Sequence, residues 1–264
     1  MIHNTAIIDP KAKIDKDVSI GAYSIIGPDV QIGSKTIIQP HVNIIGDTLI
    51  GKNNKIYSFA SIGNDPQDLK YKNEKTKLVI GDYNKIREYV TINPGTVGGG
   101  GLTKVGNNCL FMVHSHIAHD CTIGNNVILA NSVPIGGHAK IDDDVIIGGN
   151  SAVQQFTRVG KLSMIGGMCG VVKDILPYSL VFGNRSILKG VNMIGLRRKN
   201  ISNNKINNVK KAFSIIFQDN NHMENIKKIP SDMINDELIK DILEFLNSDK
   251  KRPICTPREK DENN

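Results

Sequence analysis

Aliphatic side chains recur at every sixth residue through most of the first 174 residues of the chain. A first run of this six-residue frame is followed by a short second run, and a third run continues one residue out of phase. The frame positions number twenty-five and comprise Ile8, Ile14, Ile20, Ile26, Ile32, Ile38, Ile44, Ile50, Ile56, Ile62, Ile80, Ile86, Ile92, Val105, Phe111, Ile117, Ile123, Leu129, Ile135, Ile141, Ile147, Val153, Val159, Ile165 and Val171. Self-similarity at a fixed short period indicates a solenoid.

The residue two positions before each frame residue is small in most repeats, as at Ala12, Ser24 and Cys121. Alternate residues of a strand share a face, so both positions point into one core. Glycine often follows the frame residue, and we expect it to form a corner at positive φ. Three flat faces then close one coil of eighteen residues, and stacked coils about 4.8 Å apart pair their backbones. The pattern predicts a mainly β protein, a parallel β-helix of hexapeptide repeats.

Two segments interrupt the frame and predict loops at 64–77 and 93–104. Long loops on a regular solenoid are usually functional. The glycines of the second loop are not followed by the G-K-[ST] of a nucleotide-binding loop. After residue 190 the apolar spacing becomes helical, with Ser231 as a candidate cap. We therefore predict a β-helix domain at 1–190 and a C-terminal helical domain at 191–264, and we expect residues 248–264 to fray.

The chain has 264 residues, 39% hydrophobic residues and a net charge of +7. Residues 1–184 carry a net charge of +2 and residues 185–264 carry +5, so an anionic partner is expected near the C-terminal end. Acidic residues interrupt the first thirty positions and no stretch reaches eighteen apolar residues, which favours a cytoplasmic protein without a membrane span. The four cysteines show neither metal-ligand nor disulfide spacing, and Cys109, Cys121 and Cys169 occupy the small inward position.

Histidines gather on one side of the predicted prism. His119 lies two residues past its frame residue, and His138 lies three past the frame residue one coil later. Gln155 follows on the next coil, and His116 flanks the same strand as His119. A site for chemistry is favoured, but scattered surface histidines remain an alternative. A zinc site that takes three imidazoles from among His114, His116, His119 and His138 is a second alternative. The adjacent Asp120 could orient His119 or could be a corner acid.

Several short motifs resemble the family of UDP-N-acetylglucosamine acyltransferases, over a region that extends to about Arg198. They are QDLKY at 67–71, GGGGLTK at 98–104, HIAHD at 116–120, GGH at 136–138 and GVN at 190–192. The resemblance implies a left-handed parallel β-helix, although parallel crossovers are normally right-handed. It also implies a homotrimer with its active sites between neighbouring prisms.

The resemblance implies the first step of lipid A synthesis, in which an (R)-3-hydroxyacyl group moves from acyl carrier protein to the 3-hydroxyl of UDP-N-acetylglucosamine. A sugar hydroxyl needs a positioned base, and His119 matches that base. Gly137 matches the residue whose N–H receives the oxyanion. No cofactor, metal, nucleic acid or integral membrane contact is implied. The basic C-terminal end would suit an acidic carrier protein.

Other positions match substrate-binding residues of the family. The loop residues Asp68 and Lys70 match contacts to the glucosamine and the acyl substituent, with Gln67 beside them. His116, His138 and Gln155 match residues that position the substrate, with Asp120 grouped among them. Asn192 and Arg198 match positions near the nucleotide and the pantetheine, and Gly167 falls where acyl length is set and leaves room for a long chain.

Three positions depart from the family, namely Gln154, Ile194 and Lys199. Ile cannot accept a hydrogen bond and Lys is not a bidentate fork, so the nucleotide contacts differ from the usual pattern. Alternatives are the related N-acyltransferase of the 3-O-acylated sugar nucleotide, a coenzyme A-dependent acetyltransferase of the hexapeptide class, and a purely structural solenoid. The repeat begins by Ala6, where the N-acyltransferase carries an added domain, and the outward residues form no regular Thr ladder.

Overall fold

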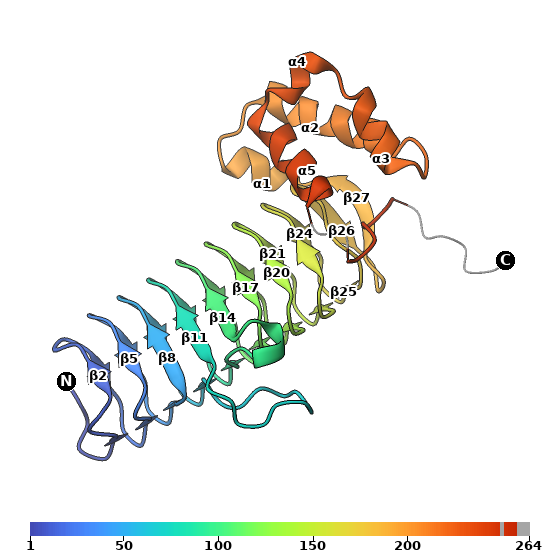
Figure 1. Ribbon diagram of the computed structural model, residues 1–264. Helices are drawn as coiled ribbons and strands as arrows, with labels where there is room; N and C mark the ends of the chain where they lie inside the picture. The colour runs from blue at the N-terminus through green and yellow to red at the C-terminus, as the bar shows by residue number, and fades with distance from the viewer. Residues whose placement is uncertain (249–250, 258–264) are drawn as a thin grey trace.

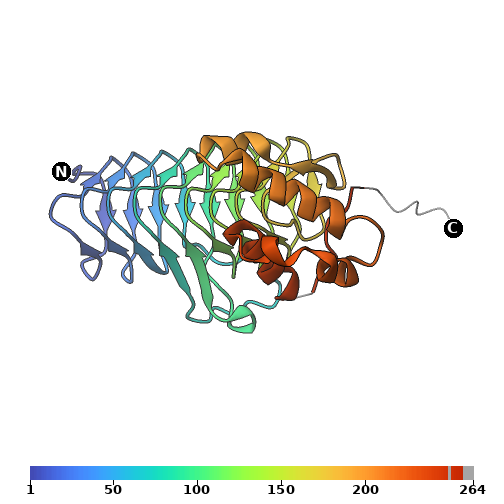
Figure 2. The ribbon, with the colours of Figure 1, turned by 90° about the horizontal axis from the view of Figure 1, so that it is seen from above.

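The computed structural model describes residues 1–248 and 251–257 and shows a left-handed parallel β-helix with a helical region at its C-terminal end (Figure 1). The coils stack along one axis, and two loops project from the middle of the prism. In the view from above, the helices lie over the last coils (Figure 2). Within the described ranges, no helix combines the length and the apolar character needed to cross a membrane.

Three parallel sheets form the faces of the prism, named face 1, face 2 and face 3 in the order in which each coil visits them. Face 1 contains β1 (Ile7–Ile8), β4 (Ile25–Ile26), β7 (Asn43–Ile44), β10 (Ser61–Ile62), β13 (Thr91–Ile92), β16 (His116–Ile117), β19 (Pro134–Ile135), β22 (Ala152–Val153) and β25 (Gly170–Val171). Face 2 contains β2 (Lys13–Ile14), β5 (Gln31–Ile32), β8 (Asp47–Ile50), β11 (Lys77–Ile80), β14 (Leu102–Val105), β17 (Thr122–Ile123), β20 (Lys140–Ile141) and β23 (Arg158–Val159).

Face 3 continues furthest toward the C-terminus. It contains β3 (Ser19–Ile20), β6 (Ile37–Ile38), β9 (Lys55–Ile56), β12 (Lys85–Ile86), β15 (Leu110–Phe111), β18 (Ile128–Leu129), β21 (Ile146–Ile147), β24 (Met164–Ile165), β26 (Ser179–Phe182) and β27 (Ile187–Val191). The last pair, β26 and β27, is antiparallel. This hairpin ends the parallel coils beneath the helices.

The six-residue frame is the core of the prism, as the sequence predicted. Each frame residue lies beside the frame residue one coil later, as Ile117 does beside Ile135. From Ile20 onward, every frame residue is at most 3% exposed. The small residues two positions earlier share this core, and the thiols of Cys109 and Cys121 contact carbonyl oxygens of the next coil. Short strands therefore suffice, because each is buried between its neighbours and the core.

The expected conformation of the corner glycines is wrong. Of the twelve glycines that follow a frame residue, only Gly63 has a positive φ. The left-handed residue of most corners lies three positions past the frame and carries a side chain, as at Asn108 and His138. The glycines are needed for close approach, because a Cβ on Gly106 would lie 2.5 Å from the carbonyl oxygen of Gly124 in the next coil. Their small size thus allows the backbones of neighbouring coils to approach closely at the corners.

The two projecting segments are shorter than the sequence suggested. Strand β11 already begins at Lys77, and β14 begins at Leu102 rather than after residue 104. Both are four residues long and pair with each other along their whole length. The second loop therefore ends at Gly101, where the chain rejoins the prism. This loop contains the short 3₁₀ helix η1 (Val97–Gly99).

The C-terminal helices are α1 (Met193–Arg198), α2 (Asn203–Ile216), α3 (His222–Asn225), α4 (Ser231–Ile234) and α5 (Glu237–Asn247), with η2 (Ile226–Lys228) after α3. Helix α2 packs on α5 and β27. The expected cap at Ser231 is wrong: Ser231 begins the short α4, and Asp236 caps the longer α5 by accepting from the backbone N–H of Leu238 at 3.0 Å. One periodic apolar run was thus divided between two helices.

The expectation of fraying is wrong for residues 251–257, which return to the prism; residues 249–250 and 258–264 lie outside the described residues. The backbone N–H of Asp174 donates to Pro253, that of Cys255 donates back to Asp174, and that of Leu188 donates to Thr256. Cys255 is 2% exposed, and burial raises its pKa to about 11. We call residues 251–257 the return segment.

Candidate active site

Two histidine rings from adjacent coils meet on the edge between faces 1 and 2. The ring centroids of His119 and His138 are 5.0 Å apart, with the rings at 90°. His138 in turn stacks on Phe156 of the following coil at 4.3 Å. All three residues follow face 1 strands, so the eighteen-residue period places them one above another. The sequence predicted the two histidines together, but it missed Phe156.

Asp120 holds the ring of His119. Its Oδ2 lies 2.8 Å from Nδ1 of His119 and accepts from the Thr96 hydroxyl at 2.6 Å. Its Oδ1 accepts from the backbone N–H of Thr96 at 2.9 Å, and its own N–H donates to the hydroxyl of Thr103 at 2.8 Å. The carboxylate is only 1% exposed. Of the two interpretations left open by the sequence, this geometry favours the orienting one.

The glycine-rich segment covers this carboxylate. A Cβ on Gly99 would lie 2.0 Å from the carboxyl carbon of Asp120, so only glycine allows the segment to pass so closely. Gly100 and Gly101 have positive φ values of 103° and 77°. Thr96 is therefore a site residue that the sequence did not single out, and Gly99 is one whose motif was recognised without a role being assigned to it. The signal that could have revealed these residues was the long glycine-containing loop that precedes the HIAHD motif in the sequence.

Gly137 lies beneath the ring of His119. A Cβ at this position would stand 2.7 Å from Cε1 and 2.8 Å from Nε2 of that ring, so any larger residue would displace the imidazole. Gly137 is buried, and its backbone N–H donates no hydrogen bond to another described residue. Buried N–H groups are nearly always paired in folded proteins. An unpaired donor beside the imidazole is consistent with a binding position for an oxygen atom.

His116, Gln67 and Gln155 line a cavity of about 390 Å³ together with His119 and Gly137. Nδ1 of His116 lies 2.7 Å from the hydroxyl of Thr91. Burial lowers the pKa of His116, and the neighbouring His119 lowers it further. Both effects favour the neutral form of the His116 ring, which lies on the outward side of face 1.

Asp68 and Lys70 lie in the first projecting loop. Asp68 is close enough to His138 to act on it electrostatically: burial lowers the pKa of His138, while the carboxylates of Asp120 and Asp68 oppose this effect. The backbone N–H of Lys70 donates to Asp68 at 3.0 Å, and the Lys70 side chain is exposed. The loop therefore brings Gln67 and Asp68 to the histidines of the same chain.

Asn192 and Arg198 lie elsewhere, in a second cavity of about 650 Å³ on face 3. Its floor is apolar, formed by Ile128, Ile146, Met164 and Leu180 from successive strands. The Asn192 amide donates to Leu162 at 2.9 Å and accepts from Gly195 at 3.0 Å, so it fixes the start of α1.

Two of the departures from the family lie in the same cavity. Ile194 is 64% exposed at its rim. Nζ of Lys199 is 2.6 Å from Oδ1 of Asp144. One prism therefore carries two separate groups of predicted site residues, on faces 1 and 3.

Gly167 lies on the edge between faces 3 and 1, and is exposed there. A Cβ added to it would lie 3.1 Å from the carbonyl oxygen of Gly149, so even alanine would be tight against the neighbouring coil. Gln154, the third departure, is exposed next to Gln155.

No three of the four candidate histidines come together as ligands of one metal ion. His114 lies on the opposite edge of face 1, where it meets the ring of Tyr89 at 5.0 Å. Ligand atoms of His119, Asp120 and His138 do fall within 4.8 Å of one another. Both carboxylate oxygens of Asp120 accept hydrogen bonds from Thr96, and Oδ2 also faces Nδ1 of His119 at 2.8 Å. These donors fit an imidazole-orienting carboxylate better than a metal ligand.

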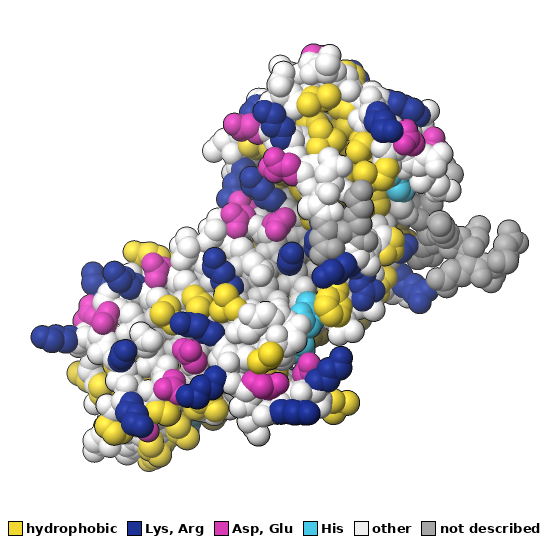
Figure 3. All heavy atoms as spheres, viewed as in Figure 1, with side chains coloured by type: hydrophobic (Ala, Val, Ile, Leu, Met, Phe, Trp, Pro, Cys, Tyr) yellow, Lys and Arg dark blue, Asp and Glu magenta, His cyan; other side chains and the backbone are white. Residues whose placement is uncertain are grey.

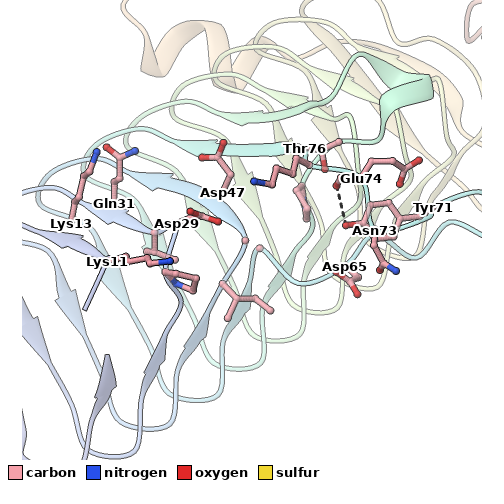
Figure 4. Close-up of a pocket in the computed structure, with 17 residues that line it drawn as sticks. Lys11, Lys13, Asp29, Gln31, Asp47, Asp65, Tyr71, Asn73, Glu74 and Thr76 are labelled. Carbon is pink, nitrogen blue, oxygen red and sulfur yellow. Dashed lines mark hydrogen bonds between the residues drawn. The ribbon is translucent and has the colours of Figure 1, made fainter. Parts of the chain in front are cut away.

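A third hollow of about 490 Å³ lies between the first projecting loop and the early coils (Figure 4). Charges of both signs line it, including Lys11, Asp29 and Asp47, and the Tyr71 hydroxyl donates to the carbonyl of Glu74 at 3.3 Å. It contains none of the predicted site residues.

Residues 174–255 match the family model described as UDP N-acetylglucosamine O-acyltransferase, domain 2, and residues 102–137 match that of the bacterial transferase hexapeptide (six repeats). An acyl-[acyl-carrier-protein]–UDP-N-acetylglucosamine O-acyltransferase from Aliarcobacter butzleri is 45% identical over 95% of this chain and 96% of its own length. The Neisseria gonorrhoeae protein of the same name is 54% identical over 82% and 84%. The solved UDP-N-acetylglucosamine acyltransferase from Campylobacter jejuni is 36% identical, covers 98% of this chain and 100% of its own, and has a TM-score of 0.92.

Proposed function

This chain belongs to the family of acyl-[acyl-carrier-protein]–UDP-N-acetylglucosamine O-acyltransferases, and from that membership we propose how its own residues carry out the transfer. The reaction moves an acyl group from the thioester of acyl carrier protein to UDP-N-acetylglucosamine in lipid A synthesis. We take the acceptor to be the 3-hydroxyl of the sugar and the donor to be a 3-hydroxyacyl thioester. The domain boundary near residue 190 is part of the same proposal.

His119 acts as the general base. With Nδ1 2.8 Å from a buried carboxylate oxygen, the ring holds its proton on Nδ1 and leaves the lone pair of Nε2 free. Nε2 removes the proton of the sugar hydroxyl as its oxygen forms a bond to the thioester carbonyl carbon. When the carbon–sulfur bond breaks, the protonated imidazole returns that proton to the leaving sulfur. The Asp120–His119 pair is the observation that carries this proposal.

The N–H of Gly137 receives the carbonyl oxygen as it becomes negative. It lies under the imidazole, where the reacting carbon must stand, and has no other partner among the described residues. A donor of this kind typically contributes a factor of about 10² to 10³ to the rate. Gly137 thus serves twice, because its missing side chain also makes room for His119.

Around this centre, Asp68, His138 and Gln155 position the sugar, while Gln67 and His116 line the cavity. Lys70 extends from the exposed loop toward the acyl substituent. A neutral His116 and a neutral His138 can each accept a hydrogen bond from a sugar hydroxyl. The lowered pKa of both rings supports this role.

We propose a homotrimer, because the site is incomplete on one chain. Asn192 holds α1 in place on face 3 and Arg198 extends from that helix, whereas the histidines lie along face 1. The core of the prism separates the two groups. If the edge between faces 3 and 1 lies at a threefold axis, face 1 of each chain meets face 3 of its neighbour and the two groups meet. Gly167, on that edge, would border the acyl chain.

The surface supports this arrangement. The outward residue of every face 1 strand is uncharged: Ile7, Ile25, Asn43, Ser61, Thr91, His116, Pro134, Ala152 and Gly170. The edge between faces 3 and 1 carries a column of stacked rings, Tyr23, His41, Phe59 and Tyr89, with centroids 5.1 to 5.2 Å apart. Phe59 and Tyr89 are 47% and 50% exposed in the single chain. Exposed apolar side chains that form a contiguous column are typical of an interaction surface, which supports the proposed interface.

The test is transfer from 3-hydroxyacyl carrier proteins of graded chain length to UDP-N-acetylglucosamine, with His119→Ala as the comparison. We expect turnover by the natural chain, and its loss in the variant while the trimer persists, because His119 lies outside the core. Equal turnover by His119→Ala would contradict the assignment of the base. A folded chain that transfers from no donor would overturn the proposed function as a whole.

A further inference from the structure

The return segment places two cations beside the histidine site. Nη2 of Arg252 donates to the backbone carbonyl of Gln155 at 2.9 Å. Nζ of Lys251 lies 5.9 Å from the centroid of the Phe156 ring, and Phe156 stacks on His138. Both cations therefore contact the coil that lies two beyond the proposed base and one beyond His138, on the same edge of the prism. Figure 3 shows histidine side chains at the surface next to Lys or Arg side chains.

The position of these cations is fixed by the fold. Backbone hydrogen bonds join Pro253 and Cys255 to Asp174, and Thr256 to Leu188, immediately after the two basic residues. The buried Cys255 thiol also donates to the carbonyl of Ser186 at 2.8 Å. A tail whose charged side chains only contacted water would not form these hydrogen bonds to the last coils. The return segment is built into the last coils and carries Lys251 and Arg252 to the edge.

The two substrates of the proposed function explain why cations would be held there. UDP-N-acetylglucosamine carries a diphosphate on the sugar, and the pantetheine arm of acyl carrier protein is attached through a phosphodiester. A phosphate group is recognised by cations that hydrogen-bond its oxygens. Lys251, Asp68 and Asp120 all lie close enough to His138 to affect its pKa, and the carboxylate of Asp120 is buried under the glycine-rich segment.

We propose that Lys251 and Arg252 bind a phosphate group of a substrate at the entrance to the histidine site. This inference rests on the proposed function and extends it, because it assigns a binding role to a segment outside the family motifs. Binding at this point orients the molecule whose reactive end lies over Gly137 and His119. Lys251 contributes charge, and Arg252 contributes charge with a geometry fixed by its contact to Gln155.

The experiment compares Lys251→Met and Arg252→Gln with the natural chain, measuring kcat and both KM values at low and high salt. Each substitution keeps most of the side-chain length and removes the charge. The control is Lys210→Met, which removes one charge from an exposed position of α2. We expect the KM for one substrate to rise by about three- to tenfold with kcat nearly unchanged, and the effect to shrink at high salt.

The donor identifies the phosphate. If the bound phosphate belongs to the carrier arm, acyl-pantetheine without phosphate will react equally well with the natural chain and with both variants. If the bound phosphate is the diphosphate of the sugar nucleotide, the KM for UDP-N-acetylglucosamine will rise in the variants, both with acyl carrier protein and with acyl-pantetheine as donor. Unchanged KM values for both substrates would overturn the proposal, as would an equal effect in Lys210→Met. A loss of kcat alone would assign the segment a structural role and equally overturn it. Turnover by the natural chain tests the proposed function separately, because it does not depend on either substitution.

Discussion

Replacing Asp120 by Asn is the most informative single change, because it preserves shape and alters only the hydrogen bonding around His119. The side-chain oxygen of Asn is expected where Oδ1 now accepts from the Thr96 N–H at 2.9 Å. The amide NH₂ then takes the place of Oδ2, 2.6 Å from the Thr96 hydroxyl and 2.8 Å from Nδ1 of His119. The opposite orientation would set two donors against each other at Thr96, at a cost of about 1–3 kcal/mol.

In the favoured orientation the amide donates to Nδ1, so the proton of the imidazole must move to Nε2. The nitrogen that faces the substrate is then a donor and cannot act as a base. General-base catalysis contributes typically about 10² to 10⁴ in rate, which corresponds to about 3–5 kcal/mol of transition-state stabilisation. We expect kcat to fall by a factor in that range, with little change in the KM for the sugar nucleotide.

The assay is steady-state transfer, run beside thermal unfolding and sedimentation to confirm an intact assembly. The matched control is Asp29→Asn, which removes an exposed carboxylate from the same edge several coils away and should leave kcat unchanged. If Asp120→Asn kept more than about a tenth of the natural kcat with an unaltered pH profile, the orienting role of Asp120 would be refuted.

Three further predictions concern stability and assembly. Gly106→Ala should lower the free energy of unfolding by about 1–3 kcal/mol because its Cβ would stand 2.5 Å from a carbonyl oxygen, whereas Gly98→Ala, with no atom within 4 Å, should be neutral in thermal unfolding. Because the pKa of His116 is lower in the folded chain than in the unfolded chain, the unfolded chain binds a proton at a higher pH. The free energy of unfolding should therefore fall as the pH drops below about 6.5. In denaturant titrations, His116→Gln should show a weaker dependence of stability on pH. Phe59→Glu should dissociate the trimer in sedimentation, while Lys13→Glu on face 2 should not; a trimeric Phe59→Glu would contradict the placement of the axis.

The sequence alone predicted the prism, because a side chain every six residues can reach one core only if the chain turns at that period. It also placed His119, His138 and Gln155 on one side of the prism, since residues about eighteen apart must stack. The same period led to the wrong conformation for glycines such as Gly106, because a repeated glycine does not reveal whether it serves a positive φ or a close approach between coils.

What only the tertiary structure decided are the contacts between segments that no period relates. Thr96 and Gly99 reach Asp120 because a loop of irregular sequence folds back over the coil, and the periodic pattern is silent about where a loop lands. The return segment was predicted to fray from its charge and prolines, yet hydrogen bonds to Asp174 hold it against the last coils. The separation of Arg198 from the histidines likewise depends on which face α1 covers. The spacing of residues within a repeat is enough to determine the geometry of the prism. The contacts of the loop, the return segment and α1 depend instead on how segments distant in the sequence pack against the prism.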